Sequence, residues 1–136
     1  MINKVYVNAD GGSRRNPGPS AIGVVIRDED NSMLSKYKEC IGEATNNVAE
    51  YRALIKALEL VAKYTRYEVQ VFMDSEFVIK QISGIYRIKA KHLYPLFQEV
   101  KNCERAFEKV TYNHVNRGSK FQIMADQLVN EALDER

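Results

Sequence analysis

The sequence predicts an α/β domain in which a mixed five-stranded sheet is flanked by helices. Two observations support this fold class. Short, β-branched apolar runs occur near the N-terminus, in the middle and near the C-terminus of the chain. Between them lie longer segments whose apolar residues recur every three or four positions, the spacing of an amphipathic helix. The predicted order is three strands, a helix, a strand, two helices, a strand and a closing helix.

The N-terminal third predicts an antiparallel meander of three strands. The stretch Val5–Ala21 reads VYVNADGGSRRNPGPSA, an apolar run followed by a loop rich in glycine and proline. A return strand over Ser20–Arg27 and a third strand over about Met33–Ile41 complete the meander. This pattern places the carboxylate of Asp10 at the end of the first strand. The alternative is a plain hairpin in which Asp10 is a turn residue.

The middle of the chain changes to helical periodicity. Apolar residues between Val48 and Tyr64 follow a three-and-four spacing, and Thr45, Asn46 and Asn47 precede them as candidate caps. The run EVQVFMD, residues Glu68–Asp74, follows this helix and is expected to form a strand parallel to the first.

The C-terminal half continues the alternation of helix and strand. Helices are predicted at Ser75–Ile82 and about Leu93–Ala106, and a fifth strand at Lys109–Val115. A polar loop over Asn116–Lys120 leads to a closing helix at about Gln122–Leu133. The chain shows no repeat and no linker, so we expect residues 1–136 to form one domain.

Composition narrows the classes of protein. A chain of 136 residues with 45% hydrophobic and 28% charged residues is typical of one soluble domain. No apolar run approaches the roughly 18 residues of a membrane span, and the N-terminus does not resemble a signal peptide, so we expect a cytoplasmic protein without membrane contact. Cys40 and Cys103 lie far apart and predict reduced thiols, not a zinc site. The net charge of +2 does not by itself indicate nucleic acid.

Four acids stand at junctions between elements. Asp10 and Asp74 end strands that we expect to be adjacent and parallel, so their side chains should meet at one edge of the sheet. Glu50 and Asp126 begin helices near that edge. Four converging carboxylates repel one another unless cations bind. Oxygen ligands favour Mg²⁺ or Mn²⁺, and two such ions about 4 Å apart suit phosphodiester hydrolysis.

Each acid also has a structural interpretation. Asn47 and Glu50 have the spacing of a capping box. Asp74 could be the N-cap of the next helix, and Asp126 could complement a helix dipole. These alternatives remain open for each residue taken singly.

Four motifs in order resemble the type 1 ribonuclease H family along nearly the whole chain. They are NADGGSRRNPGPSA, ATNNVAEYRAL, VFMDSEFV and HVNRGSKFQIMADQLVNEAL. The resemblance implies a ribonuclease H-like fold and an enzyme that hydrolyses the RNA strand of RNA–DNA hybrids, leaving 5′-phosphate and 3′-hydroxyl ends. It also implies that two Mg²⁺ or Mn²⁺ ions act with the substrate, held by Asp10, Glu50, Asp74 and Asp126. Nothing in the chain demands more than a monomer.

The resemblance further implies contacts to the hybrid. Polar side chains and backbone amides can read 2′-hydroxyls across a shallow minor groove. The matching positions, together with the cations expected near phosphates, are Gly11, Gly12, Ser13, Asn16, Asn46, Asn47, Glu76, Lys89 and Arg117.

The chain departs from the family at three places. Glu76 stands where members often carry Gln, which adds negative charge beside the phosphates. The loop Asn116–Gln122 lacks the family's histidine, so Arg117 or Lys120 is expected to act on the scissile phosphate. The chain contains no Trp, and only Gly84–Leu93 spans the region of the basic protrusion found in some members. We therefore expect weak, salt-dependent binding.

Two other functions remain open. One is a related nuclease of the same superfamily that acts on another substrate, such as double-stranded RNA. The other is a catalytically silent nucleic-acid-binding module, which would not need all four acids.

Overall fold

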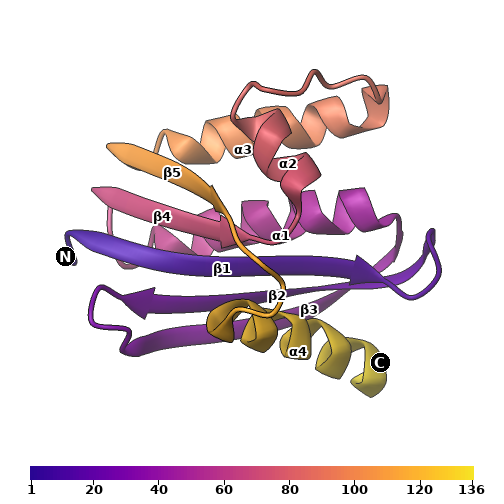
Figure 1. Ribbon diagram of the computed structural model, residues 1–136, viewed down its shortest axis with the longest axis horizontal. Coiled ribbons are helices and arrows are strands. Elements are labelled where there is room, and N and C mark those ends of the chain that lie inside the picture. The colour runs from indigo at the N-terminus through magenta and orange to yellow at the C-terminus, as the bar shows by residue number, and fades with distance from the viewer.

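The computed structural model describes residues 1–136 and contains one mixed sheet with strand order β3-β2-β1-β4-β5 (Figure 1). The strands are β1 (Lys4–Ser13), β2 (Gly18–Asp28), β3 (Met33–Ala44), β4 (Glu68–Met73) and β5 (Lys109–His114). The helices are α1 (Asn46–Val61), α2 (Glu76–Ile82), α3 (Tyr94–Glu104) and α4 (Lys120–Glu135), with a 3₁₀ turn at Lys91–Leu93. The predicted fold class and order of elements are confirmed.

The central strand β1 is antiparallel to β2 and parallel to β4. Its pairing with β2 continues to Ser13, opposite Ser20, so the prediction that Asp10 ends the strand is wrong. The glycines after Asp10 stay extended and paired to β2 instead of starting the turn. The parallel pairing with β4 does stop at Asn8, opposite Phe72, and this leaves Asp10 at the edge of the parallel part of the sheet.

The helix starts differ from the predictions by a few residues. Thr45 caps α1, since its hydroxyl accepts a hydrogen bond from the amide of Val48 at 3.2 Å, so the predicted capping box of Asn47 and Glu50 is wrong. Ser75 caps α2 in the same way, which excludes Asp74 as the N-cap. Neither Glu50 nor Asp126 falls in the first turn of its helix.

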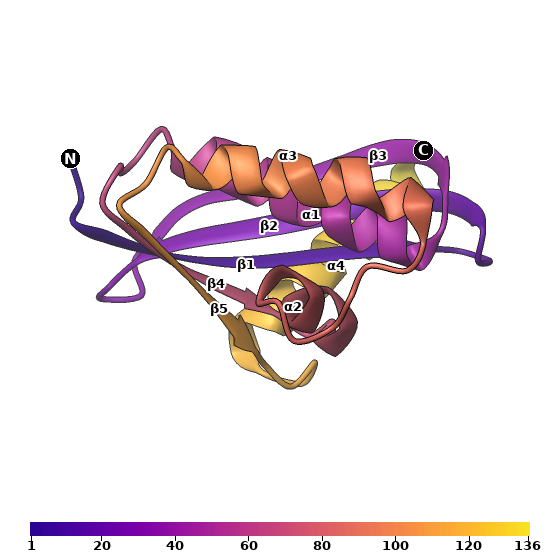
Figure 2. The same ribbon diagram turned by 90° about the horizontal axis from the view of Figure 1, so that it is seen from above.

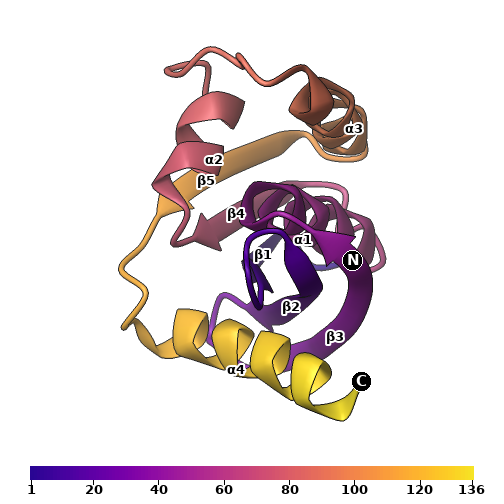
Figure 3. The same cartoon turned by 90° about the vertical axis from the view of Figure 1, so that its right-hand side faces the viewer.

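Helices cover both faces of the sheet, as Figures 2 and 3 show from two sides. On one face α1 packs against β1 and β2, and α3 packs against α1. The core lies there, between α1 and alternate strand residues such as Val7, Val24 and Val71. On the other face α4 crosses β1, β2 and β3 over a smaller apolar cluster of Ala21, Val129, Ala132 and Leu133.

Two further observations bear on the sequence predictions. None of the helices combines the length and the apolar character that crossing a membrane would require. Cys40 and Cys103 are both free thiols.

Candidate active site

Four acids from four elements line one hollow of about 380 Å³, here called the acid pocket. Asp10 comes from β1 and Asp74 directly follows β4. Glu50 comes from α1, and Asp126 comes from α4 on the opposite face of the sheet. The structure thus brings together side chains that lie up to 116 positions apart in the sequence.

The alternation of strand residues aims two of these acids the same way. Val7 and Ala9 of β1 lie in the core under α1, so Asp10 projects from the opposite face. Met73 at the end of β4 also lies in that core, and the next residue is Asp74. Because β1 and β4 are parallel neighbours, Asp10 and Asp74 emerge side by side at the same edge.

Two glycines let the helices carry the other two acids close to Asp10. A Cβ on Gly11 would lie 2.2 Å from the carbonyl oxygen of Ala49, the residue before Glu50. A Cβ on Gly23 would lie 2.3 Å from the carbonyl oxygen of Ala125, the residue before Asp126. Since Gly23 pairs with Asp10 across β1 and β2, both helices approach the sheet at this one carboxylate. Only glycine permits such close contact of backbones.

The pocket disfavours negative charge at its centre. Asp10 is only 9% exposed, and burial, followed by the charges of Asp74 and Asp126, raises its pKa to about 9. Burial also raises the pKa of Glu50 to about 7; a hydrogen bond from Ser75 opposes this shift and the charge of Asp74 adds to it. A cation in the pocket would offset both the burial of these carboxylates and their mutual repulsion.

The donor set fits a hard divalent cation. All four side chains offer oxygen, with no cysteine or histidine among the residues that line the pocket. No three acids already converge on one point as a closed cage. An open arrangement suits Mg²⁺, which keeps several waters and takes one or two carboxylates plus substrate phosphate. The residues therefore fit the predicted ions, while their roles as ligands stay a prediction.

Comparison with known proteins identifies the family. The family model described as "Reverse transcriptase-like" matches residues 8–132. The ribonuclease H of Ruthia magnifica is 34% identical over 98% of this chain and 98% of its own length. The chain belongs to the ribonuclease H family. Its fold agrees with that of LC11-RNase H1, whose structure was solved in complex with an RNA/DNA hybrid: the TM-score is 0.90, with 40% identity over 96% of this chain and 97% of that one.

Some relatives in this family are longer proteins. The bifunctional protein of Mycobacterium tuberculosis is 42% identical over 96% of this chain, but the match covers only 36% of that protein. The chain thus spans about a third of the length of such mycobacterial relatives.

The residues predicted from the ribonuclease H resemblance fall into two groups. Besides the four acids, the acid pocket is lined by Gly11, Gly12, Ser13, Asn46 and Arg117. The other predicted contacts, Asn16, Asn47, Glu76 and Lys89, do not line it. The part of both groups in binding stays a prediction.

Asn16 and Asn46 are tied together beside the pocket. The Asn46 side-chain oxygen accepts from the amide of Ser13 at 2.9 Å, and the Asn16 side-chain oxygen accepts from the amide of Asn46 at 3.0 Å. Both side chains therefore use their oxygens in bonds within the protein, which leaves their NH₂ groups free to donate.

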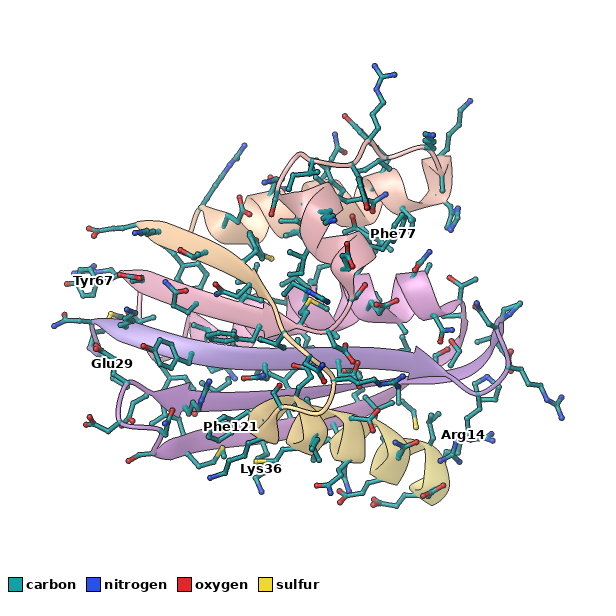
Figure 4. All side chains as sticks on the ribbon, viewed as in Figure 1. Arg14, Glu29, Lys36, Tyr67, Phe77 and Phe121 are labelled. Atoms are coloured by element: carbon teal, nitrogen blue, oxygen red, sulfur yellow. The ribbon has the colours of Figure 1, made fainter.

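Glu76 and Lys89 lie outside the pocket. Glu76 is exposed on α2 and pairs with Lys80 at 2.5 Å. Lys89 lines a separate hollow after α2, together with the exposed side chains of Phe77 and Tyr86 (Phe77 is labelled in Figure 4).

His114 is exposed, and its Nε2 lies 3.3 Å from the backbone oxygen of Asp74, near the acids but outside the lining of the acid pocket.

Sequence reasoning missed four residues at or beside the acids. Ser75, Asn130 and Arg14 line the pocket. Gln122 is buried behind it and contacts Asp74. Two of them could have been predicted from helical spacing, because Gln122 and Asn130 stand four residues before and after Asp126 on the same face of the helix.

Proposed function

We propose that this chain hydrolyses the RNA strand of RNA–DNA hybrids with two divalent ions, leaving 5′-phosphate and 3′-hydroxyl ends. The observation that carries the proposal is the acid pocket, in which the carboxylates of Glu50, Asp74 and Asp126 surround the buried Asp10. Family membership and the hybrid complex of LC11-RNase H1 support it. Mg²⁺ or Mn²⁺ bound there would supply an activated water and stabilise the leaving oxygen.

The chain's own residues would hold and orient the scissile phosphate. Asp10, Glu50, Asp74 and Asp126 would provide the ligands. Arg117 lines the pocket from a turn that Asn116 stabilises. The side-chain oxygen of Asn116 accepts a hydrogen bond from the amide of Gly118 at 2.8 Å, and its backbone oxygen accepts one from the amide of Ser119 at 3.0 Å. A guanidinium held on a hydrogen-bonded turn is well placed to bind a phosphate oxygen.

Recognition of the hybrid would come from donors beside the pocket. The free NH₂ groups of Asn16 and Asn46 suit 2′-hydroxyl and base-edge oxygens in a wide, shallow minor groove. Lys89 would contact a phosphate farther along the duplex. Such a surface reads shape and sugar chemistry, not base sequence.

The deciding experiment is a substrate panel. Labelled RNA–DNA hybrid, duplex RNA and duplex DNA are incubated with Mg²⁺, with Mn²⁺ or with chelator, comparing the wild type with Asp74→Asn. We expect metal-dependent cutting of the RNA strand of the hybrid alone, lost in the variant, with 5′-phosphate ends on the products.

Each other outcome has a definite meaning. Cutting of duplex RNA as well would replace the hybrid by a broader substrate class. Retained hybrid binding with no cutting under either metal would favour a silent nucleic-acid-binding module and contradict the proposal.

A further inference from the structure

Gln122 is the third residue of α4 and is fully buried, at 0% exposure. Its Nε2 donates to the backbone oxygen of Ala9 at 3.0 Å and to Oδ1 of Asp74 at 3.3 Å. Its Oε1 accepts from Nδ2 of Asn8 at 3.0 Å. Both polar ends of this amide are thus occupied, and one of its partners is a carboxylate of the acid pocket.

One of these bonds reaches an acid directly, and the position of Gln122 relates it to two more. Ala9 directly precedes Asp10 on β1, and Asp74 follows β4. Asp126 stands four positions after Gln122, one turn along the same face of α4. A single neutral side chain therefore ties the start of α4 to both strands that deliver aspartates to the pocket.

A second layer of contacts lies behind Gln122. The Oδ1 of Asn8 lies 3.5 Å from Nη1 of Arg27, whose guanidinium sits 4.0 Å from the ring centroid of Phe121. Phe121 precedes Gln122, and Figure 4 labels it at the start of α4, against the sheet. The N-cap residue Ser119 makes no side-chain capping bond, while Phe121 and Gln122 join the first turn of α4 to the sheet.

We infer that Gln122 is a positioning residue for the metal-binding acids, an inference that rests on the proposed function. By donating to Oδ1, its amide limits rotation of the Asp74 carboxylate and leaves Oδ2 free of that bond. By binding the Ala9 carbonyl, it fixes the spacing between α4, with Asp126, and β1, with Asp10. Gln122 acts through the acids and does not touch the substrate.

The test replaces the amide by an apolar side chain of similar length. In Gln122→Met we expect kcat for hybrid cleavage to fall roughly 10- to 100-fold with KM little changed, the size of effect found when partners of metal ligands are removed. The second readout does not depend on activity: the Mn²⁺ concentration that gives half of the metal-induced rise in Tm should increase by about tenfold or more.

Asn8→Leu is the matched control. It removes the bond from Asn8 to Gln122 and the contact of Arg27 with Asn8 in the same buried network, but leaves both Nε2 bonds of Gln122 in place. We expect a comparable loss of Tm without metal, but a much smaller change in kcat and in the Mn²⁺ response. If Asn8→Leu lowers kcat and the Mn²⁺ response as much as Gln122→Met, Gln122 is structural only and the inference is wrong.

Gln122→Asn is the conservative variant. It keeps a buried amide with a shorter reach, so kcat and Mn²⁺ response should fall between those of wild type and Gln122→Met. If Gln122→Met does not fold, the same two readouts on Gln122→Asn decide: wild-type values overturn the inference.

Failure of the proposed function looks different. A wild type that shows the Mn²⁺-induced rise in Tm but leaves the hybrid intact would contradict the proposed nuclease activity. The comparison of the Mn²⁺ response among the variants would still test the positioning role of Gln122. A wild type without any Mn²⁺ response would overturn the inference as well.

Discussion

The acid pocket and the cations around it are built in opposite ways. Asp10 is buried beneath two helices that touch the sheet at glycines, and Asp74 is bonded to a fully buried amide. The basic rim, which we define as the exposed cations Arg14, Lys89 and Arg117, includes two residues that line the acid pocket and one, Lys89, that lies outside it. Arg14, for example, pairs with Asp134 at 2.6 Å beside the C-terminal half of α4 (Figure 4).

The difference separates two tasks. Carboxylates that share a cation need a rigid frame, since a small shift changes how they share it. Cations that meet a flexible phosphate backbone need only charge and reach. Substitutions of the acids and of the residues that hold them should therefore change kcat and stability, and those in the basic rim should change affinity and its dependence on salt.

The largest effect is expected at the centre of the pocket. Asp10→Asn removes a ligand and a negative charge, so hybrid cleavage should fall by more than about 100-fold, beyond the range for partners of ligands. Single-turnover cleavage with saturating enzyme measures this without interference from affinity. Residual cleavage within tenfold of wild type would mean that Asp10 does not hold a metal.

The raised pKa of Asp10 predicts how the free energy of unfolding depends on pH when no metal is bound. Folding raises the pKa of Asp10 from its ordinary 3.8 to about 9, so between these values the folded protein holds a proton that the unfolded chain has released. The free energy of unfolding should then fall as pH rises from about 4 to about 9. Thermal unfolding in chelator should show this fall in the wild type and a weaker one in Asp10→Asn. Equal pH profiles would contradict the shift.

The contact between α1 and β1 gives the next effect. In Gly11→Ala the new Cβ would meet the Ala49 carbonyl at 2.2 Å, so α1 must move and carry Glu50 away. Overpacking of this kind costs about 1–3 kcal/mol of unfolding free energy, measured by urea unfolding, and cleavage should fall with it. In the control Gly12→Ala the Cβ would meet only Val129 Cγ1 at 3.7 Å, and stability should change by less than about 0.5 kcal/mol. Equal losses would show that close packing is not the cause.

At the basic rim the effect should be smaller and of another kind. Arg117→Ala should weaken hybrid binding and reduce the salt slope of log K by about one, because one phosphate contact is lost. Equilibrium binding in chelator at several salt concentrations measures both quantities. Lys63→Ala, an exposed cation beyond the far end of α1 from Glu50, is the control and should leave the slope unchanged.

The smallest effect is expected at Glu76. Glu76→Gln removes an exposed negative charge, and affinity for the hybrid should improve by only about twofold, since exposed charges interact weakly and Lys80 already pairs with Glu76. The gain should vanish at high salt. A tenfold gain, or a loss, would show that Glu76 contacts the hybrid directly.

The order of elements and the choice of acids could be predicted from the sequence. Strand and helix periods are local properties, and they placed all five strands and four helices with boundary errors of a few residues. The start of α1 was misplaced because Thr45 and Asn47 are both acceptable caps, and only packing chooses between them. The end of β1 was misplaced because glycines usually mark a turn, whereas here they continue the strand beneath α1.

The sheet, the helices and the choice of carboxylates follow from the sequence, because the spacing of apolar residues and the type of each side chain can be read from it directly. How those carboxylates are held depends on the packing of the folded chain. Three features depend on residues far apart in the sequence: the hydrogen bond of Gln122 to Asp74, the close contact of Gly23 with Ala125, and the raised pKa of Asp10. Such contacts arise from packing on both faces of one sheet, and no local pattern encodes them.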